Sequence, residues 1–245
     1  MSVAGRHALV TGGARGIGFA VSSLLAREGA RVSIVSRSAL SKGDFFRAQA
    51  DVTDEAQIQR AFAACRDANG AIEILVNNSG IAESAPVTRT DLAMWERIIA
   101  TNLTGTFLCT REVVPEMAAA GWGRIVNVAS TAGLAGAPYI SAYCASKHGV
   151  VGLTRAAAAE LATTGVTVNA VCPGYTETEM MQRAIANITA RTGRSEAATR
   201  ELMAQGNPEG RIATADEVAR GVLDLIEGSR SGIVLVIPDS TPVSP

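Results

Sequence analysis

Residues 10–20 read VTGGARGIGFA and place a glycine-rich turn between a β-branched run and an Ala-rich segment. Gly12 permits a tight turn, Gly16 lets backbone approach a pyrophosphate closely, and Gly18 lets a helix pack against a strand. A helix that begins here offers unpaired N–H groups and a positive dipole end to phosphates. Three glycines also fit a plain tight connection, but their place after the first buried strand favours a dinucleotide-binding turn.

Outward from this turn, short apolar or β-branched runs alternate with longer Ala-rich segments. Runs such as ILVNN (74–78) and IVLVI (233–237) are apolar nearly throughout, which is typical of strands buried on both faces of a parallel sheet. The alternation predicts one domain over residues 1–245, a doubly wound α/β sheet with helices on both faces. We expect strands at 7–11, 31–36, 47–51, 72–78, 124–130, 166–172 and 232–237, and helices at 17–29, 54–69, 91–120, 141–163 and 215–227.

Two segments depart from the alternation. Residues 38–47, SALSKGDFFR, leave little room between two strands, so we expect an abbreviated crossover made of a loop or a single turn. Residues 176–212 form a polar, helical insertion after the carboxyl end of a strand, where open α/β sheets bind ligands. A surface decoration fits this insertion, but its position favours a substrate lid.

Composition excludes several functions. The chain has 22 basic and 23 acidic residues, which argues against nucleic acid or an anionic membrane as the main partner. No apolar run approaches the roughly 20 residues that span a bilayer, and the N-terminus lacks a signal-peptide layout, so we expect a cytoplasmic protein. The cysteines lack CxxC spacing and the chain has two histidines, so we expect no metal site. We expect small buried thiols at Cys65, Cys109, Cys144 and Cys172.

The end of the second predicted strand bears on which dinucleotide binds. An acidic residue there would accept a hydrogen bond from the ribose 2′-hydroxyl of NAD, but residues 34–38 read IVSRS. Arg37 can pair with the 2′-phosphate of NADP, and Ser36, Ser38 and Arg15 can add donors. A solvated loop residue is the alternative for Arg37. The absent acid favours NADP, as NADPH, over NAD.

Asp51 ends the third predicted strand in the stretch ADVTD. Its carboxylate can accept a hydrogen bond from the adenine amino group, with Val52 covering the ring. A helix N-cap is the alternative for Asp51, although Thr53 or Asp54 fits that position better.

Tyr143 and Lys147 lie four residues apart in the predicted helix 141–163, so they share a face. A nearby cation favours tyrosinate and lowers the pKa of a tyrosine. We therefore expect Lys147 to bring Tyr143 toward the range of a useful general acid or base. Ser130 ends a predicted strand at the same sheet edge, where its hydroxyl can donate to a substrate oxygen. Spacing alone is also compatible with an ordinary tyrosine and lysine on one helix face.

Three more polar residues have more than one interpretation. Asn102 interrupts the predicted helix 91–120, which indicates a local kink, a backbone hydrogen bond or a role in the site. Ser141 either touches substrate or caps its helix. His148 points about 100° away from Lys147, which favours a packed or interface histidine.

Taken together, these residues resemble the short-chain dehydrogenase/reductase family nearly end to end. The resemblance rests on TGGARGIG (11–18), DVTD (51–54), NNSG (77–80), NLTG (102–105), Ser130 thirteen residues before Tyr143, YCASK (143–147) and CPGYTET (172–178). It implies a seven-stranded Rossmann-like sheet and hydride transfer between NAD(P) and a carbonyl or alcohol. The chain departs from the family at Ser79, in the short segment 226–232 and in its VIPDSTPVSP ending.

The resemblance also implies roles for the matching residues. Ser130, Tyr143 and Lys147 would be catalytic, with Asn102 holding a water that links Lys147 to solvent. Lys147 would also bind the nicotinamide ribose, and Thr178 the carboxamide. A homotetramer or homodimer would form through the two long helices, 91–120 and 141–163. With the residues argued above, the expected cofactor set is Gly12, Arg15, Gly16, Ile17, Gly18, Ser36, Arg37, Asp51, Val52, Asn78, Gly80, Tyr143, Lys147, Pro173, Gly174 and Thr178.

The insertion 176–212 bears on the substrate. We expect flexible apolar lining from Met180, Met181 and Ile185. The ending NPEGR (207–211) resembles family members that act on β-keto or β-hydroxy acyl thioesters. Arginines could receive the phosphates of coenzyme A or acyl carrier protein, although a mixed-charge surface helix fits them nearly as well. These arginines are Arg191, Arg194, Arg200 and Arg211.

The sequence therefore predicts a 3-oxoacyl-thioester reductase or 3-hydroxyacyl dehydrogenase that uses NADP(H). One alternative is an NAD(H)-dependent reductase of a small cyclic or aromatic ketone or alcohol. Another is a dinucleotide-binding sensor or structural subunit without turnover. The set Ser130, Tyr143 and Lys147 speaks against the last alternative, because a binding protein needs the glycine turn but no acid.

Overall fold

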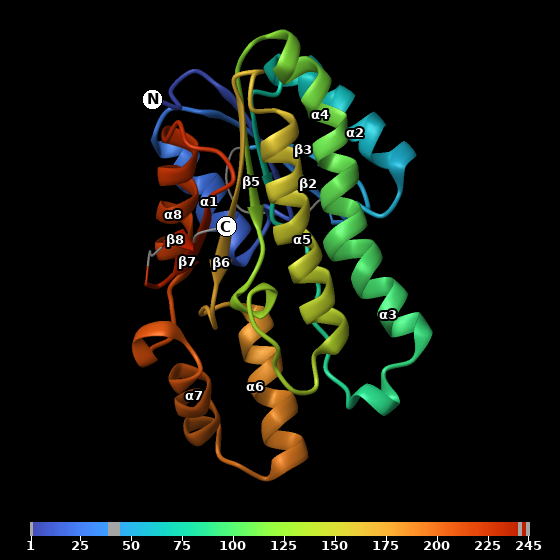
Figure 1. Ribbon diagram of the computed structural model, residues 1–245, viewed down its shortest axis with the longest axis vertical. Helices are drawn as coiled ribbons and strands as arrows, with labels where there is room; N and C mark the ends of the chain where they lie inside the picture. The colour runs from blue at the N-terminus through green and yellow to red at the C-terminus, as the bar shows by residue number, and fades with distance from the viewer. Residues whose placement is uncertain (1, 39–44, 240–241, 244–245) are drawn as a thin grey trace.

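A single sheet runs through the molecule (Figure 1). The computed structural model describes residues 2–38, 45–239 and 242–243, so residues 39–44 of the expected short crossover lie outside the described residues. The strands are β1 (His7–Thr11), β2 (Arg31–Ser36), β3 (Phe46–Gln49), β4 (Ile74–Asn77), β5 (Gly123–Val128), β6 (Val166–Pro173), β7 (Val234–Ile237) and β8 (Pro242–Val243).

The strand order is β3-β2-β1-β4-β5-β6-β7-β8. Strands β1 to β7 pair in parallel, which confirms the predicted doubly wound sheet of seven strands. The two-residue β8 was not predicted and pairs antiparallel with β7. The order reverses between β1 and β4, so the carboxyl ends of these two strands flank the crevice where such sheets bind ligands.

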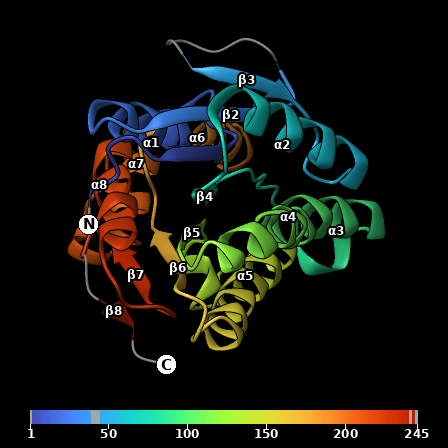
Figure 2. The same ribbon diagram turned by 90° about the horizontal axis from the view of Figure 1, so that it is seen from above.

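Helices cover both faces of the sheet (Figure 2). One face packs against α1 and α8, and the other against α2, α4 and α5. Each residue of β1 is buried; Ala8 and Val10 belong to the first core, and Leu9 to the second. The described helices are α1 (Gly16–Arg27), α2 (Glu55–Asn69), α3 (Leu92–Ile99), α4 (Gly105–Ala119), α5 (Ser141–Glu160), α6 (Glu179–Thr192), α7 (Glu196–Gln205) and α8 (Ala215–Glu227).

The helix expected over residues 91–120 is interrupted. Between α3 and α4 lies a π-helical segment, Ala100–Thr104, with Asn102 at its centre. A π turn carries one residue more than an α turn and often lies at a functional site. The structure thus confirms the predicted irregularity at Asn102 and corrects the expectation of one continuous helix.

The insertion 176–212 is helical, as predicted, and extends beyond the carboxyl edge of the sheet (Figure 1). It contains α6, α7 and a short 3₁₀ turn, Pro208–Gly210. Met181 and Ile185 of α6 pack against Met203 of α7, which gives the insertion a small apolar core of its own.

Two further expectations concern the rest of the chain. The four cysteines are free and buried, as predicted. Within the described residues, every helix is too short or too polar to cross a membrane.

Candidate active site

The glycine turn presents the amino end of α1 at the carboxyl edge of β1. Gly12 and Gly16 have φ of 65° and 53°, in the left-handed region that favours glycine. A Cβ on Gly18 would lie 2.4 Å from both the Gly12 oxygen and Asn78 Nδ2, so the helix can approach the turn only with glycine there. Ile17 is half-buried and packs against the core beneath α1.

The turn fits a pyrophosphate. In the described structure no side chain caps the first N–H groups of α1, and its first turn contains no acidic residue. Asn78 braces the turn instead, because its Nδ2 donates to the carbonyl oxygens of Thr11 and Gly12 at 3.0 and 3.1 Å. These backbone donors and the positive end of the helix dipole suit the phosphates of a dinucleotide. The role of Asn78 here is to hold the turn.

Three of the four residues expected near an adenosine 2′-phosphate, Ser36, Arg37 and Ser38, lie at the end of β2, and Arg15 lies in the glycine turn. Arg37 is exposed, and its carbonyl oxygen accepts from Gln49 Nε2 at 3.0 Å. Ser36 Oγ donates to the Ser38 oxygen at 2.7 Å. Arg15 Nη1 lies 3.2 Å from Glu179 Oε2 on α6, so this arginine connects the glycine turn to the insertion.

Asp51 and Val52 follow β3. Asp51 Oδ1 accepts from Thr53 N and Oγ1 at 3.0 and 2.8 Å, while Asp54 caps α2 by accepting from Gln57 N at 3.0 Å. Asp51 therefore is not the helix cap, and its carboxylate stays at the sheet edge. Val52 is buried, and a Cβ on Gly105 would lie 2.8 Å from its Cγ2.

Asn102 is buried, and its amide group holds the loop after β4. Its Oδ1 accepts from Ile81 N at 2.8 Å, and its Nδ2 donates to the Ile81 oxygen at 2.9 Å and to Ser146 Oγ at 3.0 Å. A Cβ on Gly80 would lie 3.3 Å from Asn102 Oδ1 and 3.7 Å from Lys147 Nζ. Gly80 thus lets the loop pass between the amide of Asn102 and the ammonium of Lys147.

Ser130, Tyr143 and Lys147 meet at the carboxyl ends of β5 and β6. Lys147 is 5% exposed, and its Nζ donates to the Val128 oxygen at 2.8 Å. Ser130 Oγ accepts from Ala132 N at 3.1 Å, which leaves its O–H as a donor. The side chain of Ser130 also lies close enough to the Tyr143 hydroxyl to lower the pKa of Tyr143.

Burial dominates the electrostatics of this group. It raises the pKa of Tyr143 above the usual 10, and the nearby side chain of Ser130 opposes this rise. It lowers the pKa of Lys147 to about 8. The pKa of Tyr143 is thus raised and not lowered as expected, because its hydroxyl is desolvated; Lys147 Nζ lies 5.7 Å from the centroid of the Tyr143 ring.

The carboxyl end of β6 joins the insertion to the site. Pro173 is the buried last residue of β6, and Gly174 N donates to the Ile237 oxygen at 3.0 Å. Thr178 caps α6 through its hydroxyl, which accepts from Met181 N at 3.3 Å. A Cβ on Gly16 would lie 3.4 Å from Thr178 Cγ2, so the glycine turn and the start of α6 are neighbours.

The residues expected around the substrate separate into two groups. Met180 is 39% exposed, whereas Met181 and Ile185 are buried between α6 and α7. The prediction that Met181 and Ile185 line the pocket is therefore corrected: they stabilise the insertion.

Ser141 is the first residue of α5, and Ile140 is its N-cap without a side-chain bond, so Ser141 is not the helix cap. His148 is exposed and its Nδ1 lies 2.9 Å from the Cys144 oxygen.

Three of the four arginines considered for phosphate binding have side-chain partners in the described structure. Arg200 forms an ion pair with Glu177, and Arg211 lies 2.9 Å from Glu209 and 2.7 Å from Glu217. Arg191 Nη1 lies 3.4 Å from the Ser84 oxygen, and Arg194 is exposed.

Three residues that shape the site were not predicted from the sequence. Asn207 accepts from Tyr175 N at 2.6 Å and donates to the oxygens of Tyr175 and Arg211 at 2.8 and 2.7 Å, so it ties the two ends of the insertion together. Ser146 accepts from Asn102 Nδ2 and donates to the main-chain carbonyl oxygen of Tyr143. Tyr175 is 43% exposed and close enough to Tyr143 to affect its pKa. The NPEGR ending was the only available signal for Asn207.

Comparison with known proteins identifies close relatives. A model of the short chain dehydrogenase family matches residues 6–189. The D-beta-hydroxybutyrate dehydrogenase of Rhizobium meliloti is 37% identical over 228 residues, 87% of this chain and 88% of that protein. The cis-4-hydroxycyclohexanecarboxylate dehydrogenase of Sinomonas cyclohexanicum is 38% identical over 241 residues, 94% of this chain and 92% of that protein. A crystal structure of a variant actinorhodin polyketide ketoreductase with NADPH superposes with a TM-score of 0.89 and 34% identity, covering 95% of both chains.

Proposed function

Since this chain belongs to the short-chain dehydrogenase family, whose relatives above act on hydroxyl or keto groups, we propose that it is an NADP(H)-dependent 3-oxoacyl reductase. The reverse reaction is the oxidation of a 3-hydroxyacyl compound. The proposed substrates are thioesters of coenzyme A or acyl carrier protein. The observation that carries the proposal is the meeting of Ser130, Tyr143 and Lys147 at the sheet edge beside the glycine turn.

Each residue of this group has a proposed task. The nicotinamide of a bound dinucleotide supplies the hydride or takes it up. Tyr143 holds a proton at neutral pH, because burial raises its pKa, and donates it to the carbonyl oxygen of the substrate. Ser130 donates a second hydrogen bond to the same oxygen. In the oxidative direction Tyr143 must first lose its proton, so oxidation is favoured at higher pH.

Lys147 and Asn102 support this proton transfer. Lys147, whose pKa burial lowers to about 8, can exchange a proton near neutral pH and so restore that of Tyr143. Asn102 fixes Ile81 and Ser146 around this lysine, which keeps the route from solvent in one geometry. The proposed cofactor residues place the pyrophosphate at α1, the adenine near Asp51 and Val52, and the nicotinamide near Thr178 and Lys147.

The choice of NADP(H) rests on the exposed Arg37 and on the absence of an acid in residues 34–38. Arg37→Ala should weaken NADPH binding about tenfold, the value of one charge-assisted contact, and leave NADH binding unchanged. The exposed Arg60→Ala on α2 is the matched control. Equal NADPH affinity in both variants would remove the proposed role of Arg37.

The substrate class rests on the relatives and on the insertion. A hydroxybutyrate dehydrogenase and a polyketide ketoreductase both point to a 3-oxygenated acyl group. Arg200 and Arg211 are already paired with carboxylates. We therefore propose that Arg191 and Arg194 bind the phosphates of coenzyme A or acyl carrier protein. The cyclohexane-carboxylate relative keeps a cyclic ketone as the second candidate.

Oxidation of NADPH with acetoacetyl-CoA, acetoacetate and cyclohexanone tests these candidates. We expect the highest kcat/KM with acetoacetyl-CoA; a preference for cyclohexanone would favour the cyclic class. Tyr143→Phe should lower kcat by 10²–10⁴, the contribution of a general acid, and retain NADPH binding. The exposed Tyr139→Phe is the control. If the wild type and Tyr143→Phe are equally inert while NADPH binds, the protein is a sensor or a structural subunit.

Assembly into a homotetramer or homodimer is part of the proposal. Leu92, Trp95 and Phe107 on α3 and α4 are 68%, 39% and 43% exposed, which supports a contact through these helices. Sedimentation of the wild type and of Phe107→Glu tests it, because a charge at this contact should favour the monomer.

A further inference from the structure

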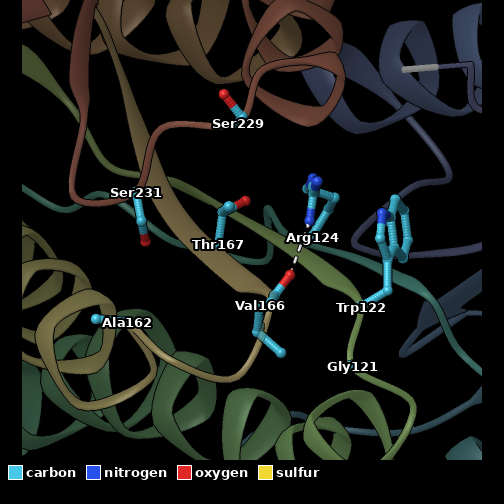
Figure 3. A pocket seen from close by; sticks show the side chains of 9 residues that line it. Gly121, Trp122, Arg124, Ala162, Val166, Thr167, Ser229 and Ser231 are labelled. Carbon is cyan, nitrogen blue, oxygen red and sulfur yellow. Dashed lines mark hydrogen bonds between the residues drawn. The ribbon is translucent and has the colours of Figure 1, made fainter.

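A cavity of about 330 Å³ lies at the amino-terminal edge of the sheet, on the opposite side from the candidate active site. Its walls come from the α4–β5, α5–β6 and α8–β7 connections and from the first residues of β5 and β6. Figure 3 shows Trp122, Arg124 and Thr167 side by side in this cavity, with Ser229 and Ser231 at its border. None of the proposed catalytic or cofactor residues contributes to it.

Two polar atoms of the lining are buried without a hydrogen-bond partner among the described residues. They are Nε1 of Trp122 and Oγ1 of Thr167. Buried polar atoms are nearly always hydrogen-bonded, so two such atoms in one cavity require an explanation. An indole N–H can only donate, so whatever satisfies Trp122 must be an acceptor.

A buried guanidinium, that of Arg124, lies beside these atoms, whereas the neighbouring Arg6 is paired with Glu73 at 2.5 Å. Arg124 is 3% exposed, and its guanidinium donates to the carbonyl oxygens of Ile226, Gly123 and Gly165 at 3.1, 2.8 and 3.2 Å. Its Cζ lies 4.5 Å from the centroid of the Trp122 ring, and that of Arg6 lies 3.5 Å from it. Burial and the charge of Arg6 lower the pKa of Arg124, so an added negative charge here would be favourable.

We propose that this cavity binds a small oxyanion, a carboxylate or phosphate group, which accepts hydrogen bonds from Trp122 Nε1 and Thr167 Oγ1 beside the guanidinium of Arg124. Oxyanions match both requirements of the site, because they offer several acceptor lone pairs and pair with guanidinium groups. Joining the end of α8 to the starts of β5 and β6 explains the contacts of Arg124 with Ile226, Gly123 and Gly165, but it leaves the two unpartnered donors and the cavity unexplained.

The chain offers a direct probe. It contains two tryptophans, Trp95 and Trp122, so in a Trp95→Phe background all tryptophan fluorescence reports on the cavity wall. This protein is titrated with sodium phosphate and with sodium acetate, and sodium chloride keeps the ionic strength constant. We expect a saturable change of fluorescence with at least one anion; the anion that binds more tightly identifies the phosphate or the carboxylate class. A response that stays linear with both anions would overturn the proposal.

Thr167→Val in the same background removes only the hydroxyl and keeps the shape of the strand residue. We expect it to weaken binding about tenfold, the effect of one lost hydrogen bond to a charged group. Thr163→Val, at an exposed position outside the lining, is the matched control. An anion that binds only at the glycine turn would leave both variants with the parent affinity, and this result would overturn the site.

Discussion

The Tyr143–Lys147 group and the insertion 176–212 border the same edge of the sheet, but different forces hold them. Lys147 and Asn102 are buried and hydrogen-bonded to the backbone of Val128 and Ile81. The insertion is held by exposed ion pairs and by the small core around Met203. It is also held by the hydrogen bonds with which Asn207 joins Tyr175 to Arg211, a contact that we call the clamp of Asn207. Buried hydrogen bonds are costly to leave unmade, whereas exposed ion pairs contribute little.

Under the proposed function, this difference separates proton transfer at the Tyr143–Lys147 group from the selection of a substrate by the insertion. A group that must transfer a proton needs fixed distances, which buried backbone contacts provide. A region that selects a substrate can change its conformation when its contacts are weak and its apolar core is separate from the core of the sheet. The first region therefore has an energetic cost: Lys147 is buried although burial lowers its pKa to about 8.

Lys147→Met should give the largest effect, and in two directions. Without the proposed proton exchange, kcat should fall by 10²–10⁴. At pH 7 the variant should nevertheless be more stable than the wild type by about 1–2 kcal/mol, because relief of the desolvated charge exceeds the loss of one hydrogen bond. Steady-state kinetics and urea unfolding measure the two effects.

The stability gain should depend on pH. The pKa of Lys147 is about 8 in the folded protein against an ordinary 10.5, so between these values the unfolded chain binds more protons. The stability of the wild type should rise with pH across this window relative to that of Lys147→Met. The difference in the free energy of unfolding between Lys147→Met and the wild type should thus narrow from pH 7 to pH 9.5. A constant gap would mean that the buried charge does not limit stability.

Much of the sheet, the glycine turn and the Tyr143–Lys147 group could be predicted from the sequence. The strands are recognisable because runs such as ILVNN are buried on both faces, and the glycine turn because no side chain fits at Gly18. Helix periodicity places Tyr143 and Lys147 on one face. Their pKa values could not be predicted, since they depend on the depth at which α5 packs against β5 and β6.

Asn102→Ala should be the next largest change. It removes three side-chain hydrogen bonds, and it leaves the backbone N–H and C=O of Ile81 without partners. We expect a loss of about 3 kcal/mol in the free energy of unfolding, with at least a tenfold lower kcat. Ser146→Ala, which loses one of these bonds, should cost about 1 kcal/mol. Equal losses in the two variants would show that the π segment does not depend on the amide of Asn102.

Asn207→Ala tests the clamp of the insertion. Because Asn207 bonds to Tyr175 and Arg211 at the two ends of the insertion, its loss should loosen the substrate region and spare the proton-transfer group. We expect KM to rise about tenfold while kcat changes less than twofold. This pattern results when a variant loses an interaction that stabilises the bound substrate and the transition state equally. Asn187→Ala, exposed on α6, is the control. A fall in kcat with unchanged KM would join the insertion to the chemical step.

The details of the insertion could not be predicted from its sequence. Met181 and Ile185 have the spacing of pocket-lining residues, but their burial depends on where α7 returns against α6. The arginines were predicted either to receive phosphates or to lie on a surface helix of mixed charge, and Arg200 and Arg211 pair with carboxylates that lie far along the chain or across a turn. Such pairings between exposed side chains leave no periodic signal.

Glu177→Gln should have the smallest effect on stability and sharpens the assignment of the substrate. The pair with Arg200 is exposed, so its loss should change the free energy of unfolding by less than about 1 kcal/mol, and less still at high salt.

The substitution Glu177→Gln also frees Arg200. If the insertion receives the phosphates of coenzyme A, KM for acetoacetyl-CoA should fall about threefold at low salt, as expected for one exposed ion pair, while KM for acetoacetate stays constant. An unchanged KM for both substrates would place the nucleotide end of a thioester away from Arg200, and the insertion would then select the substrate by its acyl group.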